Sequence, residues 1–368
     1  MPLSEASDGP KSPSGAFFCP GPSTVEIPFA LPRLPCYDGH MENLEPADTS
    51  LRAERVKATA ALARRLEAAA SAAFVGSPRA VQLAVLALLS GLHSLVEDIP
   101  GVGKTTLALA LSKAAGLSFS RIQFSPDLLP GDVLGMNVWD SAAREFVFKS
   151  GPINANFVLA DEMNRASPRT QAAFLEAMQE GGTTIDGKTV SLPSPFFLLA
   201  TQNPQGFAGT FPLPEAELDR FGLSFSLGYP SAGDEAEILR RWKEEGPLAA
   251  VVPVARAEDI QDARGTIASV AVSAKLREYI VQIVRATRGN PDIRLGASPR
   301  ATVSLQAAAR AVAAARGRSY AIPEDVEYIA PSALAHRLFL SSRARLSGSD
   351  AVALVAALAA AVPKPTGL

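Results

Sequence analysis

The chain has 368 residues, of which 47% are hydrophobic and 20% charged, so it is long and apolar enough to fold into about two domains. The 35 Lys and Arg against 37 Asp and Glu give a net charge of −2, which excludes nucleic-acid binding through bulk positive charge. Two cysteines and three histidines exclude a disulfide scaffold and argue against a histidine-based metal site. No apolar run reaches the ~20 residues of a membrane span, and no signal peptide opens the chain. We therefore expect a reduced, cytoplasmic protein.

The first 50 residues differ in composition from the rest of the chain. They hold nine of the 29 prolines, with seven acidic residues against two basic ones. Proline removes backbone donors, and the segment shows no helical or strand period. We therefore expect residues 1–50 to form a disordered, acidic, proline-rich leader.

From residue 51 onward the pattern becomes regular. The composition predicts helices at residues 51–73 and 79–89. Short apolar runs typical of buried strands lie at 93–97, 117–124, 157–160 and 196–200. Strands that alternate with helices indicate an α/β fold, a parallel sheet with flanking helices. We assign this α/β domain to residues 51–230.

After residue 231 the sequence indicates helices and no strands. The expected helices are at 234–245, 273–288, 301–316 and 351–362. We assign residues 231–368 to a small α-helical lid domain.

The most informative segment is residues 93–106, HSLVEDIPGVGKTT, in which an apolar strand runs into a glycine turn and then a helix. This order builds a phosphate-binding loop, because glycines let backbone amides turn inward and the helix N-terminus adds positive potential. Lys104 would reach the outer phosphates of ATP, and Thr105 would bind Mg²⁺. Asp98 stands where the usual pattern has glycine, so we expect its side chain to point away. The predicted nucleotide-binding residues are Pro100, Gly101, Val102, Gly103, Lys104, Thr105 and Thr106.

Two carboxylates follow the apolar run at 157–160, and they come 57 residues after Lys104. Asp161 is expected to hold Mg²⁺, directly or through water, and Glu162 to polarise the water that attacks the phosphate. Asn203 follows the next apolar run, and we expect it to position the same water.

Together these motifs resemble the MoxR family of AAA+ ATPases. After the phosphate-binding loop come DEMNRA at 161–166, TQNP at 201–204, LPEAELDRF at 213–221 and GASPRA at 296–301. RIQFSPDLLPGDVLG at 121–135 also resembles the family's stretch after the second strand. The resemblance covers about residues 51–362 and implies a P-loop NTPase fold with a helical lid.

The same resemblance implies an activity and partners. It implies ATP hydrolysis with Mg²⁺ by a homo-oligomer, a hexameric ring that acts as a chaperone on a client protein. A protein with a von Willebrand factor A domain is the implied partner, in complex maturation or in metal or cofactor insertion. Arg220 matches the arginine finger, which contacts the nucleotide of the neighbouring subunit. Arg300 matches the second sensor, which reaches the nucleotide from the lid.

Two hairpins are also expected, at residues 132–148 and 183–192, the second around a turn at 186–187. The resemblance implies that such hairpins face the pore of the ring. Trp139, Phe146 and Phe148 then either hold a client chain or pack the first hairpin onto the core.

Three other functions stay open. A nucleic-acid-dependent ATPase would need basic hairpins, and neither hairpin has a basic excess. A non-hydrolysing nucleotide-gated scaffold would normally lack Glu162 or Arg220, and this chain keeps both. A magnesium-chelatase-like motor subunit shares the broad architecture.

Overall fold

A five-stranded parallel sheet forms the centre of the molecule. The computed structural model describes residues 46–202, 210–241 and 246–366, so most of the predicted leader lies outside the described residues. The strand order is β2-β5-β8-β1-β9, and all neighbouring strands are parallel. The strands are β1 (Ser94–Glu97), β2 (Phe119–Gln123), β5 (Phe157–Asp161), β8 (Phe197–Gln202) and β9 (Leu223–Phe225). The predicted parallel sheet is confirmed.

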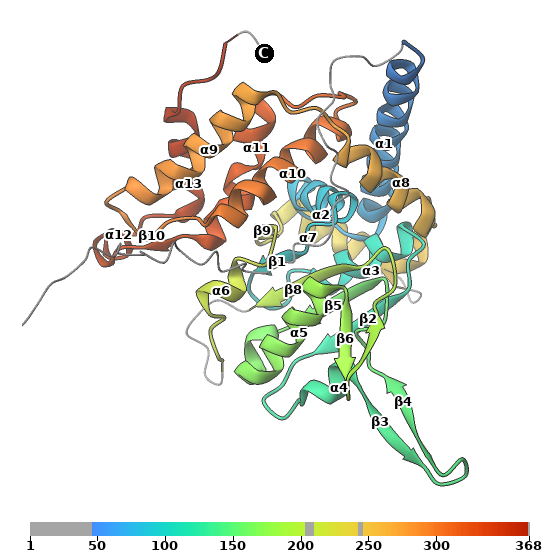
Figure 1. Ribbon diagram of the computed structural model, residues 1–368. Coiled ribbons are helices and arrows are strands. Elements are labelled where there is room, and N and C mark those ends of the chain that lie inside the picture. The colour runs from blue at the N-terminus through green and yellow to red at the C-terminus, as the bar shows by residue number, and fades with distance from the viewer. Residues whose placement is uncertain (1–45, 203–209, 242–245, 367–368) are drawn as a thin grey trace, which may run out of the picture.

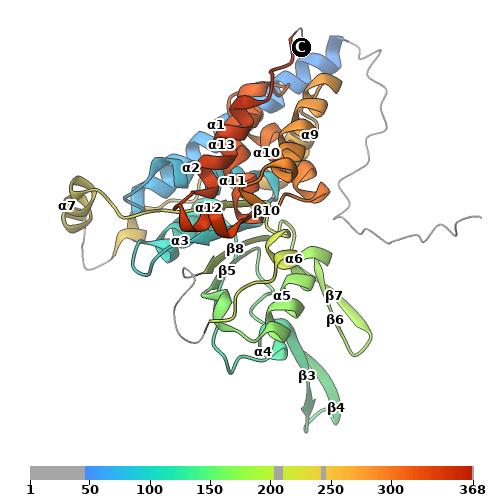
Figure 2. The ribbon, with the colours of Figure 1, turned by 90° about the vertical axis from the view of Figure 1, so that its left-hand side faces the viewer.

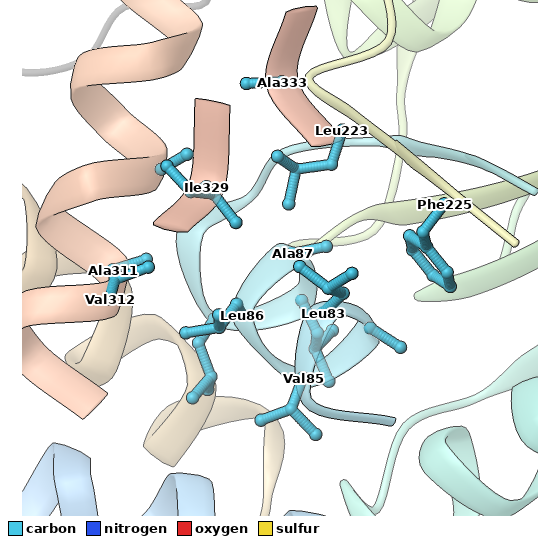
Figure 3. Packing of buried hydrophobic residues seen from close by; sticks show 14 of the residues in the cluster. Leu83, Val85, Leu86, Ala87, Leu223, Phe225, Ala311, Val312, Ile329 and Ala333 are labelled. Atoms are coloured by element: carbon cyan, nitrogen blue, oxygen red, sulfur yellow. The ribbon is translucent and has the colours of Figure 1, made fainter. Parts of the chain in front are cut away.

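Helices from both ends of the chain cover one face of this sheet. The first three are α1 (Pro46–Ala73), α2 (Pro78–Ser90) and α3 (Lys104–Ala114). Helix α2 begins where Ser77 accepts a hydrogen bond from the Ala80 amide, and it ends at Gly91 in a left-handed conformation. Nine residues of α2 are buried, because this helix lies between the sheet and the lid. Figure 3 shows side chains of α2 packed beside those of β9 and those of the lid helices α10 and α11.

The lid is mainly helical, as predicted. Its helices are α7 (Ala232–Arg241), α8 (Ala257–Ala268), α9 (Ala274–Gly289), α10 (Pro299–Ala315), α11 (Pro323–Leu334), α12 (Ser342–Leu346) and α13 (Ala351–Ala361). One continuous buried cluster includes residues of α1, α2, the sheet and the lid. The lid therefore shares a core with the α/β part, and a domain boundary near residue 230 stays a prediction.

The expectation that strands stop after residue 231 was wrong. The lid contains an antiparallel pair, β10 (Ile293–Leu295) and β11 (Phe339–Leu340). A strand of two or three residues is too short to show the alternation of apolar and polar residues that identifies a strand. Its formation depends on pairing with a distant segment rather than on local sequence. Strand β9 was missed for the same reason. Helices α8 and α11 were not predicted either, and α11 contains an internal proline, Pro331, which weakened its pattern.

The opposite face of the sheet is covered by a second set of elements. These are α4 (Pro130–Leu134), α5 (Pro168–Glu180), α6 (Glu215–Leu218) and a 3-10 helix, Met163–Arg165. A second buried cluster joins them to the alternate residues of the central strands, including Leu95 and Val158. The sheet is thus buried on both faces, as a parallel sheet requires.

Both predicted hairpins are present and are joined to each other. They are β3 (Gly135–Asp140) with β4 (Glu145–Ser150), and β6 (Gly182–Ile185) with β7 (Lys188–Ser191). The β3–β4 hairpin projects from the body, away from the lid (Figure 1), and β6–β7 extends beside it (Figure 2). The Asn137 amide donates a 2.6 Å hydrogen bond to the Asp186 carboxylate in the turn of the second hairpin.

The aromatic residues of the first hairpin have different environments. Trp139 and Phe146 face each other near its end with ring centroids 5.2 Å apart, and they are 52% and 69% exposed. They therefore do not pack the hairpin onto the core. Phe148, near the base, is partly buried and lies against Gly135.

Across residues 46–202, 210–241 and 246–366, no helix has both the length and the apolar character needed to cross a membrane.

The base of the first hairpin leaves no room for a side chain at Gly151. A Cβ there would lie 2.2 Å from the Val133 carbonyl oxygen and 2.5 Å from the Gly135 amide nitrogen. We expect Gly151→Ala to lower the free energy of unfolding by about 1–3 kcal/mol, because backbone atoms must move. Thermal denaturation measures this loss. In Gly265→Ala, on α8, the new Cβ meets no atom within 4 Å, so this control should be neutral or slightly stabilising. Equal melting temperatures for both variants would contradict the packing argument.

Candidate active site

The phosphate-binding loop connects the end of β1 to the start of α3. Gly101 and Gly103 have φ angles of 87° and 93°, a left-handed region that disfavours side chains. A Cβ at Gly103 would also lie 3.1 Å from the Phe74 ring. Gly103 caps α3 without a side-chain hydrogen bond, so the first amides of the helix keep free donors. This N-terminus is suited to bind an anion.

Lys104, the first residue of α3, is buried beneath the loop. Its Nζ donates a 2.6 Å hydrogen bond to the Asp98 carbonyl oxygen. Burial lowers the pKa of Lys104, while the charges of Asp98, Asp161 and Glu162 act to raise it. The structure therefore brings the loop lysine within electrostatic reach of both predicted acids.

The Asp98 carboxylate is directed toward the chain that follows β9. It accepts hydrogen bonds from the Leu227 and Gly228 amides, at 2.6 and 2.8 Å, and from the Ile99 amide at 3.0 Å. These donors direct the carboxylate toward residues 227–228, while the lysine ammonium bonds to the Asp98 carbonyl oxygen. The expected orientation is confirmed.

Asp161 lies at the end of β5, separated from the loop strand β1 only by β8. Its Oδ1 accepts a 2.6 Å hydrogen bond from the Thr201 hydroxyl at the end of β8. Its Oδ2 accepts from Arg121 of β2, at 2.6 Å from Nη2 and 3.2 Å from Nε. A carboxylate at the carboxyl ends of three strands, near the loop, is well placed to bind a metal ion.

Glu162 has a strained backbone, with φ 55° and ψ 45°. Its amide donates a 2.9 Å hydrogen bond to the Thr201 hydroxyl oxygen. Its Oε2 accepts from Gln123 Nε2 at 3.1 Å and from Arg165 Nη1 at 2.9 Å. A left-handed glutamate held by several partners indicates a functional position.

Thr201 is a site residue that sequence reasoning missed. It is fully buried, and its hydroxyl joins the Asp161 carboxylate to the Glu162 amide. The sequence feature that could have identified Thr201 was its place in the TQNP motif, two residues before Asn203. Asn203 itself lies outside the described residues, so its predicted role stays a prediction.

Arg121 and Gln123 were also missed. Side chains two residues apart lie on the same side of a strand, so the spacing of Arg121 and Gln123 on β2 indicated that both could face the same neighbour. Sequence alone did not show that β2 would lie beside β5 with these side chains against the acids.

Arg220 lies far from this group. It precedes β9, whose first residue, Leu223, pairs with Ser94 at the start of β1, whereas the loop follows the end of β1. Four residues of strand span about 13 Å, so Arg220 and the loop are at opposite edges of the sheet. Its Nε lies 3.2 Å from Glu217 Oε2.

Arg300, at the start of α10, lies on the same side as Arg220. Burial raises the pKa of Glu217, and the nearby charges of Arg220 and Arg300 act to lower it. The structure thus divides the predicted residues into a group around Lys104, Asp161 and Glu162 and a second group formed by Arg220 and Arg300.

The first group fits Mg²⁺ bound with a nucleotide. Among the described residues, no cluster of three or more His, Cys, Asp or Glu side chains could form a metal site by itself. Mg²⁺ commonly takes one or two protein ligands and completes its shell with phosphates and water. The Asp161 carboxylate, with the predicted ligand Thr105 in the first turn of α3, would be such a limited set.

Comparison with known proteins agrees with this geometry. Residues 93–223 match the family model described as "ATPase family associated with various cellular activities (AAA)", and residues 285–358 match the AAA lid domain. The chain is 45% identical over 291 residues to the uncharacterized protein YeaC of Bacillus subtilis, covering 79% of this chain and 91% of that protein. It is 42% identical over 276 residues to the chaperone MoxR1 of Mycobacterium tuberculosis, covering 73% of each chain.

The chain belongs to the MoxR family of AAA+ ATPases. The fold is similar to a solved structure from Cytophaga hutchinsonii described as a "putative ATPase", with a TM-score of 0.80 at 33% identity, covering 87% of this chain and 99% of that one. Both the P-loop sheet and the helical lid of the MoxR family are therefore present.

The Thr201 hydroxyl gives a specific test of the MoxR site. Thr201→Val removes the bond to Asp161 and the acceptor for the Glu162 amide, with little change in shape. We expect ATPase activity or apparent Mg²⁺ affinity to fall about 10- to 100-fold, as for other residues that orient metal ligands. Thr201→Ser keeps the hydroxyl and should retain most activity. A Mg²⁺ titration of the ATPase rate measures both. A Thr201→Val protein with the parental Mg²⁺ requirement and rate would contradict the assignment.

Proposed function

We propose that this protein hydrolyses ATP with Mg²⁺ and uses the energy to remodel or mature a partner protein complex. The observation that supports this most is the convergence of Lys104, Asp161 and Glu162 at one edge of the sheet. The backbone amides of the loop and Lys104 would bind the phosphates. Thr105 and Asp161 would hold Mg²⁺, which neutralises charge on the phosphoryl group as it transfers.

In this proposal Glu162 accepts a proton from the attacking water, and Asn203 orients that water. A carboxylate on a strained turn with polar neighbours is held in a defined position, which general-base catalysis needs. Gln123 and Arg165 both donate to Oε2 of this carboxylate and hold it in place.

The second group of residues supports action between protomers. Arg220 cannot reach the loop of its own chain, so we propose that it contacts the nucleotide of the next protomer in a homo-oligomeric ring, a hexamer. Arg300 lies near it, so we propose that the lid sensor acts on the same neighbouring nucleotide. An arginine supplied in trans is worth about 10³–10⁵ in rate in related phosphoryl transfers.

The hairpins support a protein client. The β3–β4 hairpin carries Arg144 and Lys149 against Asp140 and Glu145, so it lacks the positive charge that nucleic acid would need. Its exposed aromatic pair offers an apolar surface instead. We propose that this pair contacts the client, with a von Willebrand factor A-domain protein as adaptor. Metal or cofactor insertion is the proposed process.

Two substitutions at the site separate binding from turnover. Lys104→Ala removes the phosphate-binding cation and should abolish ATP binding. Glu162→Gln keeps the shape but cannot accept a proton, so ATP should still bind while turnover falls by at least about 10²-fold. Fluorescent-nucleotide titration and phosphate release measure the two properties. Parental turnover by Glu162→Gln would rule out the proposed base.

The aromatic pair can be tested by client capture. Glu162→Gln with ATP should retain a client that affinity purification recovers. Adding Trp139→Ala and Phe146→Ala should reduce recovery at least about fivefold, because exposed aromatic side chains supply most of such contacts. The matched control adds Leu346→Ala, which removes a 90% exposed side chain from α12 in the lid. Equal capture by all three proteins would exclude the hairpin as the client contact.

A further inference from the structure

The residues on either side of Arg220 are held by the lid. Asp219 accepts hydrogen bonds from the Ser298 hydroxyl at both carboxylate oxygens, at 3.0 and 2.8 Å. Its Oδ1 also lies 3.4 Å from Arg337 Nη1. Ser298 caps the start of α10, where its Oγ accepts a hydrogen bond from the Arg300 amide. One lid hydroxyl thus joins the residue before Arg220 to the backbone of Arg300.

The residue after Arg220 is fixed from the same side. The Phe221 carbonyl oxygen accepts a 2.6 Å hydrogen bond from Arg337 Nη2, and His336 Nε2 lies 2.9 Å from it. Arg337 donates from Nη2 to the Ser304 hydroxyl of α10 as well, at 3.0 Å. Arg337 therefore reaches both neighbours of Arg220 and the helix that carries Arg300.

Arg220 itself has few contacts in its own chain. Its Nη1 is buried and, within the described residues, has no hydrogen-bond partner, and its Nε makes only the 3.2 Å ion contact with Glu217. The side chain is 22% exposed, so a rotation of the guanidinium would bring this unused donor to an acceptor from outside the chain.

We infer that Arg337, through Asp219 and the Phe221 carbonyl, is a positioning residue that orients Arg220 toward the nucleotide of the next protomer. This inference rests on the proposed function. The lid would then have two roles. It covers the α/β domain of its own protomer, and it orients the arginine that acts on the nucleotide of the next protomer.

The charge of Arg337 supports a role beyond packing. Only 4% of the residue is exposed. Burial lowers the pKa of Arg337 to about 10, while Asp219 acts to raise it, so the guanidinium stays charged at neutral pH. A buried ion pair is often no more stabilising than apolar residues of similar volume. One planar guanidinium contacts both Asp219 and the Phe221 carbonyl oxygen, the two neighbours of Arg220. Apolar residues of similar volume could not make these two directed contacts.

Mixed rings of full-length protein test this inference. Arg337→Met removes the guanidinium and keeps much of the volume. Rings of the Arg337→Met protein alone should keep the parental ATP affinity, while their ATPase activity falls at least about tenfold. The reason is that the defect lies in the arginine that each protomer provides to its neighbour. Mixed with Lys104→Ala, which has an intact Arg220 and a defective loop, activity should return. Random pairing predicts about one quarter of the parental rate per protomer.

Arg220→Ala mixed with Lys104→Ala is the reference. If this reference mixture recovers and the Arg337→Met mixture does not, Arg337 acts only inside its own chain and the inference is overturned. If the reference mixture itself fails, the action of Arg220 in trans is overturned, and the inference fails with it. The two failures are therefore distinguishable.

Two further variants separate positioning from stability. Asp219→Asn removes the ion pair with Arg337 but keeps an oxygen for Ser298, so it replaces Arg337→Met if that protein does not fold. It should show the same loss alone and the same recovery in mixed rings.

Asp325→Asn is the matched control, since Asp325 is a fully buried lid carboxylate paired with Arg316 and Arg318. It should lower the melting temperature without a tenfold loss of activity, measured below that temperature. A tenfold loss in Asp325→Asn that mixing also restores would overturn the specificity assigned to Arg337.

Discussion

The order of the parallel strands is the constraint on which the rest of this structure depends. With β8 between β1 and β5, the loop lysine and the two acids must lie at the carboxyl edge of the sheet. With β9 beside β1, the segment that enters β9 must lie at the amino edge, and it carries Arg220. A single chain therefore carries these two groups of residues at opposite edges of the sheet. Burial of both sheet faces makes this arrangement rigid, because a shift of one strand would expose apolar surface.

At the carboxyl edge, the charged groups are paired with groups of the protein itself. Lys104 binds a carbonyl oxygen, Arg121 binds Asp161, and Arg165 binds Glu162. Lys104 and Asp161 are buried, so their internal partners offset the cost of burying these charges in the absence of nucleotide. Nucleotide and metal binding must exchange some of these partners for phosphate and Mg²⁺, and the cost of that exchange is a physical control on affinity.

Long periodic elements and ordered motifs were readable from the sequence, and short or distant relationships were not. The helix at α1, the central strands, both hairpins and the glycine loop followed from composition and turn residues. Strands β9, β10 and β11 have only two or three residues each, so their formation depends on partners far along the chain. For the same reason the contact between Ser298 and Asp219 had no sequence signal, although each residue stood inside a recognised motif.

The link between the two hairpins has a mechanical consequence. Asn137 ties the long ribbon to Asp186, and the second ribbon continues directly from helix α5. The other end of α5 follows the short segment that begins at Glu162. One hydrogen bond, the second hairpin and helix α5 therefore connect the first hairpin to the segment that begins at Glu162, so a displacement of this hairpin would act on the glutamate through continuous structure.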